Sequence, residues 1–120
     1  MSGWFSRPVL FVSSVERAIE FYCDKLGFAE TDRYQEDGKI LVASIVREDC
    51  DLLLNCQQPA DRTGMGRIFI SLDPGTIDEL RAEFESRGAP VEDGWWGYDT
   101  MIVRDPDGNE LFFPYPGAND

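Results

Sequence analysis

The side chains that could carry chemistry in this 120-residue chain include three cysteines and 23 acidic residues, but no histidine. A serine or cysteine nucleophile is normally activated by a histidine base, and histidine is the commonest ligand of transition metals. Without such a base, Cys23 is interpreted as a structural thiol on a helix. Glu110 could act as a general base in a dry pocket, although a solvated hairpin residue is the simpler interpretation. The composition therefore argues against histidine-dependent hydrolysis and metal catalysis.

The charge balance limits the classes of partner. Asp and Glu outnumber Lys and Arg by 23 to 11, which gives a net charge of −12. Such a surface repels phosphate backbones, so we expect no nucleic-acid partner. It would attract cationic ligands, although solubility alone also explains the charge.

Apolar runs, the N-terminal residues and the cysteines bear on membrane association and on the cellular compartment. No apolar run reaches the roughly 18 residues of a membrane span, and the N-terminus lacks the features of a signal peptide, so no membrane partner is expected. The cysteines, Cys23, Cys50 and Cys56, are odd in number and lack metal-like spacing. They fit reduced thiols in a cytoplasmic protein.

Residues 101–113 carry the clearest local motif, a predicted β-hairpin with an apolar strand on each side of the sequence DPDGN. Pro106 fixes φ near about −65°, and Gly108 accepts the positive φ that closes the turn. Asp105 and Asn109 can bond the local backbone through their side chains. By itself, this motif is typical of an ordinary surface hairpin.

The first half of the chain predicts a strand, a helix and three further strands. Pro8–Val12 is a nearly all-apolar run, read as a buried strand. Ser13 and Glu16 have the spacing of a capping box, and Gly27 supplies the left-handed residue that ends the helix. Extended segments follow at 28–34, 40–46 and 51–55.

The second half predicts the same order. After a polar linker, 57–66, the run Arg67–Leu72 alternates as a strand, and Asp73 begins a helix that Gly88 ends. Ser13 and Asp73 lie 60 positions apart, and the two terminating glycines lie 61 apart. Further strands begin at Val91. The pattern predicts two copies of one unit, 8–56 and 67–115, in a single domain covering 1–120.

The first helix reads Val15-Glu16-Arg17-Ala18-Ile19-Glu20-Phe21-Tyr22 and is followed by Leu26-Gly27-Phe28. With the DPDGN turn, it resembles the vicinal oxygen chelate superfamily, which includes glyoxalase I, extradiol dioxygenases and bleomycin resistance proteins. The resemblance covers about residues 8–115. It implies an α+β fold in which two βαβββ modules form an open, cup-like mixed sheet. It also implies a homodimer whose pockets can be completed by the partner subunit.

The resemblance locates the places where enzymes of this superfamily hold their metal, usually with His and Glu. Here these places are occupied by Arg7, Leu53, Arg67 and Phe112. Guanidinium groups only donate hydrogen bonds and stay charged, and apolar side chains offer no lone pair. We therefore expect no metal or other cofactor. An all-carboxylate site for Mg²⁺ or Ca²⁺ stays open, although no residues are spaced like one.

By strand alternation, the same face should also carry Phe11, Asn55 and Phe69. Adjacent Trp95 and Trp96 point to opposite faces, so at most one of them lines the cup. As a set, such residues suit an aromatic or cationic drug or metabolite. The expected ligand-binding residues are Arg7, Phe11, Leu53, Asn55, Arg67, Phe69, Trp96, Tyr98 and Phe112.

The resulting hypothesis is a metal-free small-molecule binding protein of bleomycin resistance type, with no catalytic residue. Arg7 and Arg67 could pair with a carboxylate on the ligand. The alternative is a glyoxalase- or dioxygenase-like enzyme, a lyase or isomerase acting on a small organic substrate.

Overall fold

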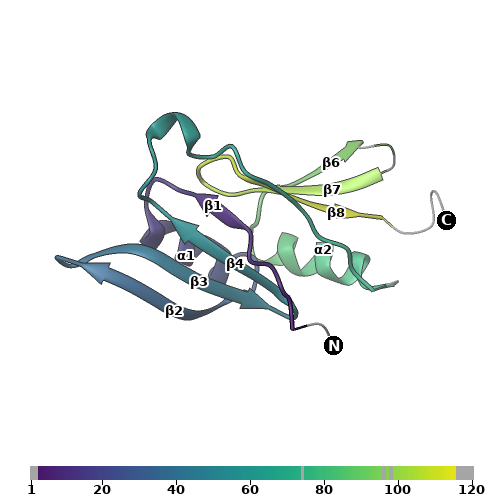
Figure 1. The fold of residues 1–120 in the computed structure, drawn as a ribbon. Helices are drawn as coiled ribbons and strands as arrows, with labels where there is room; N and C mark the ends of the chain where they lie inside the picture. The colour runs from purple at the N-terminus through teal and green to yellow at the C-terminus, as the bar shows by residue number, and fades with distance from the viewer. Residues whose placement is uncertain (1–2, 74, 96, 98, 116–120) are drawn as a thin grey trace.

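The computed structural model describes residues 3–73, 75–95, 97 and 99–115. Within them, the chain forms two units, each with the order strand, helix and three strands (Figure 1). The first unit comprises β1 (Val9–Phe11), α1 (Val15–Asp24), β2 (Ala29–Glu36), β3 (Lys39–Arg47) and β4 (Cys50–Asn55). The second comprises β5 (Arg67–Phe69), α2 (Ile77–Ser86), β6 (Val91–Trp95), β7 (Asp99–Arg104) and β8 (Glu110–Pro114), after a short 3₁₀-helix, η1 (Ala60–Arg62).

The strand order confirms the predicted α+β fold of two βαβββ modules. The first sheet has the order β1-β4-β3-β2 and the second the order β5-β8-β7-β6. In each sheet the first and last strands of the module pair in parallel, and the remaining pairs are antiparallel. The mixed sheet is thus divided into two four-stranded sheets, with α1 beside the first and α2 beside the second (Figure 1).

Strand alternation divides each sheet into a core face and an open face. On β4, Leu52 and Leu54 belong to the buried core, so the intervening Leu53 lies on the other face. On β8, Leu111 and Phe113 belong to the same core. Because one core joins both sheets, the two open faces point away from it.

The DPDGN turn lies between the modules, with its two end residues buried and Pro106 and Gly108 exposed. Asp105 and Asn109 are 5% and 0% exposed. Asp105 Oδ1 accepts from the backbone N–H groups of Asp107 and Asn109, as expected of a local turn. Its Oδ2, however, accepts the hydroxyl of Tyr22 on α1 at 3.0 Å. The turn therefore ties the second module to the helix of the first.

Asn109 makes further buried hydrogen bonds, which join the turn to β1 and to the linker. Its amide donates to the carbonyl of Phe11 at 3.1 Å, and its Oδ1 accepts from the N–H of Gly66 at 2.8 Å. Gly64 has φ +78°, and a Cβ there would lie 1.9 Å from the carbonyl oxygen of Asp107. Only glycine fits a linker pressed this closely against the turn.

A second link joins the modules at the far end of the helices. Arg47, at the end of β3, pairs in bidentate fashion with Glu83 on α2, at 2.7 and 2.8 Å. The same guanidinium donates to the carbonyl of Leu26 at 2.7 Å. Paired guanidinium and carboxylate groups in this geometry fix orientation as well as contributing energy.

Both predicted helix starts are wrong in detail. Helix α1 is capped by Ser14, whose Oγ accepts from the N–H of Arg17, because the N–H of Ser13 instead donates to Asp107 across the module boundary. Helix α2 begins at Ile77 and not at Asp73. The left-handed Gly75, φ +86°, breaks the helical path before it.

Other local predictions hold more closely. Gly27 and Gly88 have φ +73° and +78°, as expected of residues that end helices. The predicted strand Arg67–Leu72 is shorter, because pairing with β8 stops at Phe69. No helix in the described part of the chain is long and apolar enough to cross a bilayer.

We expect Tyr22→Phe to lower the free energy of unfolding by about 1.5–3 kcal/mol, because it removes a buried hydrogen bond to a charged acceptor. Tyr34→Phe is the matched control, since its hydroxyl also donates to a carboxylate, Glu36, at 3.0 Å, but in an exposed pair. The control should change stability by no more than about 0.5 kcal/mol. If urea unfolding gave the same loss of unfolding free energy for both variants, the buried Tyr22–Asp105 hydrogen bond would add no more stability than an exposed one.

Tyr22 also predicts a dependence on high pH. Burial, and then the Asp105 carboxylate, raise the pKa of Tyr22 above its ordinary value. Above about pH 10 the unfolded chain loses the phenolic proton while the folded chain keeps it, so stability should fall as pH rises. In urea titrations from neutral to alkaline pH, Tyr22→Phe should flatten this decline. A wild-type slope in the variant would contradict the assignment.

Candidate functional site

Six of the expected ligand-binding residues are divided between the two open faces. Phe11, Leu53 and Asn55 lie on β1 and β4 of the first sheet. Arg67, Phe69 and Phe112 lie on β5 and β8 of the second. No strand pairing joins the two sheets within the described ranges. One chain therefore presents two half-sites.

The first open face is apolar, with a polar end. Val9 pairs with Leu53, and Phe11 pairs with Asn55, so these four side chains share one face of two parallel strands. Asn55 Oδ1 accepts from the N–H of Gln57 at 2.7 Å, whereas no hydrogen bond from its amide nitrogen is found in the described part. That nitrogen is available as a donor.

A linker residue that sequence reasoning missed also contributes here. The Arg62 guanidinium in η1 lies 5.4 Å from the centre of the Phe11 ring. A cation at this distance over an aromatic face is attracted by the ring quadrupole. The polar linker gave no sign of this contact in the sequence, because the contact depends on how η1 folds back towards β1.

The second open face carries a pair of stacked rings. Phe69 and Phe112 have ring centres 6.3 Å apart and an interplanar angle of 28°. Phe112 is only 5% exposed, yet it does not belong to the common core, whereas its neighbours Leu111 and Phe113 do. The stack therefore lies on the opposite side of the sheet from the common core, with Phe69 half-buried and Phe112 almost fully covered.

A charged row runs beside these rings across all four strands of the second sheet. Glu110 on β8 accepts from Arg67 on β5 at 2.9 Å and from Arg104 on β7 at 2.8 Å. Arg104 also pairs with Glu92 on β6. The row alternates two cations with two anions, so its charges balance. Both oxygens of Glu110 are engaged, which gives no support to its role as an isolated base.

Arg7, another expected residue, lies away from these pairings. Arg7 precedes β1 and is exposed, with its guanidinium 5.5 Å from the centre of the Phe5 ring. Trp96 and Tyr98 lie outside the described residues. Trp95, the last residue of β6, is 71% exposed.

The superfamily's metal positions do not fit a metal here. Arg7 and Arg67 are cationic, and Leu53 and Phe112 have no ligating atom. Among the described residues, no group of three or more Cys, Asp or Glu side chains converges as a metal site. The charged Arg67, already paired with Glu110, would repel a cation placed on the second open face.

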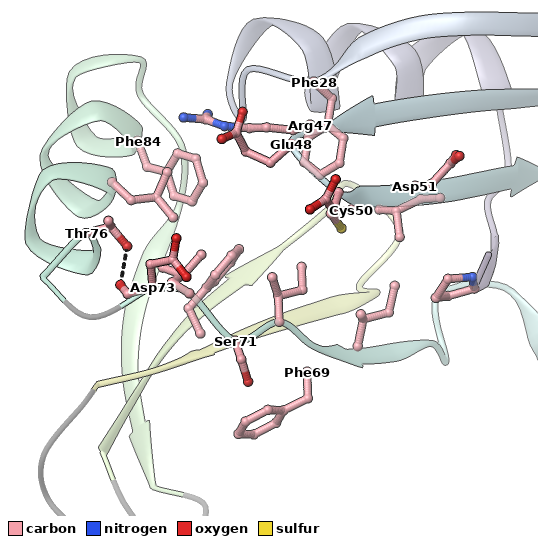
Figure 2. Close-up of a pocket in the computed structure, with 18 of the residues that line it drawn as sticks. Phe28, Arg47, Glu48, Cys50, Asp51, Phe69, Ser71, Asp73, Thr76 and Phe84 are labelled. Atoms are coloured by element: carbon pink, nitrogen blue, oxygen red, sulfur yellow. Dashed lines mark hydrogen bonds between the residues drawn. The ribbon is translucent and has the colours of Figure 1, made fainter. Parts of the chain in front are cut away.

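A groove of about 690 Å³ lies between the modules, apart from the open faces (Figure 2). It is lined by the β3–β4 turn, residues 68–73 and α2. Leu53, Asn55 and Phe112 are absent from its lining. Phe69 lies in the lining, but Figure 2 shows its ring on the opposite side of the chain from Cys50 and Phe84.

The surroundings of Cys50 and Cys23 disfavour the thiolate form of each side chain. Burial, and then Asp51, raise the pKa of the Cys50 thiol in the groove. Burial, and then Asp24 and Glu30, raise the pKa of Cys23 on α1. Neither thiol is therefore activated as a nucleophile, which agrees with the structural role predicted for Cys23.

Comparisons with known proteins agree with this fold. Residues 4–113 match the model of the glyoxalase/bleomycin resistance protein/dioxygenase superfamily, and the chain belongs to that family. A bleomycin resistance protein from Geobacillus stearothermophilus is 30% identical over 90% of this chain and 93% of its own length. The bleomycin resistance character predicted from the sequence is thereby confirmed.

Two solved structures share the architecture. TnmS3, an antibiotic binding protein from Streptomyces sp. CB03234, has a TM-score of 0.74, with 22% identity over 98% of this chain and 99% of its own. A bleomycin-binding protein from Streptomyces verticillus, solved with copper(II)-bleomycin, has a TM-score of 0.72, with 22% identity over 98% of this chain and 100% of its own.

We expect the purified protein to hold no stoichiometric transition metal, because cationic and apolar residues occupy the superfamily's metal positions. Elemental analysis by mass spectrometry, before and after incubation with Mn²⁺, Ni²⁺ or Fe²⁺ and gel filtration, measures this. One retained ion per chain, lost on substitution of Arg67 or Phe112, would contradict the expectation.

Proposed function

We propose that this protein binds and sequesters a small organic molecule that carries an aromatic group, in the manner of its bleomycin resistance relatives. The observation that carries the proposal is the Phe69–Phe112 stack, a pair of aromatic rings outside the common core, of which Phe69 is the more exposed. Aromatic surfaces of this kind bind planar ligands by offset stacking. The names of the curated relatives support a drug as the ligand.

The polar contacts of the proposed site differ from those expected at first. Arg67 is 61% exposed but already pairs with Glu110, so it is not an unpaired cation waiting for a ligand carboxylate. The amide nitrogen of Asn55 is the better-placed donor on the first open face. Arg62, over the Phe11 ring, adds a cation beside it.

The ligand site is proposed to form between two copies of the chain in a homodimer. The two half-sites lie on faces that point away from one shared core, so a single chain does not bring Leu53 and Phe112 together. A second copy that sets its first open face against the second open face of its partner would complete both halves. Apolar residues on each open face would then be removed from water.

A cytoplasmic location is part of the same proposal. Cys23, Cys50 and Cys56 are all free thiols, which suits a reducing compartment.

Titration with bleomycin, followed by tryptophan fluorescence, tests the ligand proposal. Phe112→Leu keeps an apolar side chain but removes the stacking ring, so it should weaken binding by about 1 kcal/mol, or roughly fivefold. Phe21→Leu is the control, because Phe21 on α1 also contacts another ring, edge-to-face with Tyr22, but lies off the open faces. Equal weakening in both variants would remove Phe112 from the site.

Complementation tests the proposed dimer. Leu53→Arg and Phe69→Arg each place a charge on one half-site and should each abolish bleomycin binding. Differently tagged copies, co-expressed and purified through both tags, should regain part of the binding, because one site in each mixed dimer keeps both native halves. If both half-sites came from the same chain, the mixed protein would bind no better than either variant.

A further inference from the structure

We infer that the groove between the modules is a second binding site, which takes an organic cation with an apolar body. Its volume of about 690 Å³ is within the usual range of small-molecule sites. The residues that line it come from both modules, so a bound molecule would contact the two halves of the chain at once. Nothing in the proposed function requires this groove.

The floor of the groove is apolar and partly open to solvent. Ile68, Ile70, Leu72 and Leu80 line it, and each is half-buried against the common core. The ring of Phe84 lies among them, and Figure 2 shows it facing the groove from α2. A ligand with an aromatic or alkyl body would cover this surface and displace water from it.

The rim of the groove carries an excess of negative charge. Glu48 and Asp49 line it from the first module, and Asp73 and Glu79 from the second. None of these four carboxylates makes an ion pair within the described part of the chain.

The groove has no spare cation to balance them. Among the described residues that line it, Arg47 is the one basic side chain. Both of its terminal nitrogens pair with Glu83, which also accepts from Arg87. The rim therefore favours a cationic guest and opposes an anionic one.

The arrangement of the acids points to an organic cation and not to a metal ion. A metal site needs several ligand atoms within bonding distance of one point. The described acids and cysteines form no such group, and the acids are spread over both rims. A charged organic group above an apolar floor needs only nearby carboxylates, so it fits a dispersed rim.

Ethidium, a planar aromatic cation, is a suitable probe, with binding measured by fluorescence. Glu79→Arg is the test variant, because it places a cation in the rim. Asp78→Arg is its matched control, since Asp78 is also exposed in the first turn of α2 but does not line the groove. Both substitutions change the net charge and the helix terminus equally.

We expect Glu79→Arg to weaken ethidium binding about tenfold, and Asp78→Arg to weaken it no more than about twofold, because its charge is farther away and screened. The anionic dye 8-anilino-1-naphthalenesulfonate should bind the wild type more weakly than ethidium. Equal losses in the two arginine variants would show attraction by overall charge alone and would overturn the proposal.

Phe112→Leu separates this proposal from the proposed function. Ethidium binding should be unchanged in Phe112→Leu, and bleomycin binding should be unchanged in Glu79→Arg, because the residues belong to different sites. Loss of ethidium in Phe112→Leu but not in Glu79→Arg would place the dye on the open face. That result would overturn the groove site while leaving the bleomycin site intact.

Discussion

The turn from Asp105 to Asn109, whose two end residues are buried, is the contact on which the rest of the structure depends. Each βαβββ module has an amphipathic sheet whose apolar face must be covered, and each module covers part of the other. Apolar packing alone is not directional, whereas the hydrogen bonds of Asp105 to Tyr22 and of Asn109 to Phe11 and Gly66 are. These buried polar groups hold the two modules in one relative orientation, because leaving any of them unpaired would be costly.

That orientation produces two surfaces of different chemistry. The open faces carry aromatic and aliphatic side chains beside a row of balanced charges, Arg67, Glu110, Arg104 and Glu92. The inter-module groove carries, above an apolar floor, carboxylates that form no ion pair with any described residue. The first surface suits a guest selected by stacking, and the second suits one selected by charge. Both follow from the same packing of two similar halves.

The sequence predicted the elements well where a local cause dominates. Gly27 and Gly88 end their helices because positive φ there is a local requirement. The helix starts were predicted less well. The backbone N–H of Ser13, for example, donates to the Asp107 carboxylate, which is 94 positions distant along the chain. The resemblance to the superfamily placed Leu53 and Phe112 on their strands, and the structure finds each on an open face.

The sequence by itself determined the duplicated fold, the family and the absence of histidine, because each depends on residue type and local spacing. Only the tertiary structure decided that Asp105 and Asn109 of the DPDGN turn are buried and bond to the first module, and that Glu110 pairs with Arg67 and Arg104. The tertiary structure also divided the expected ligand-binding residues between two open faces. It placed Glu48 and residues of α2 along the same groove. Such contacts join residues far apart in the chain, and their partners are set by how the modules pack, which no local pattern records.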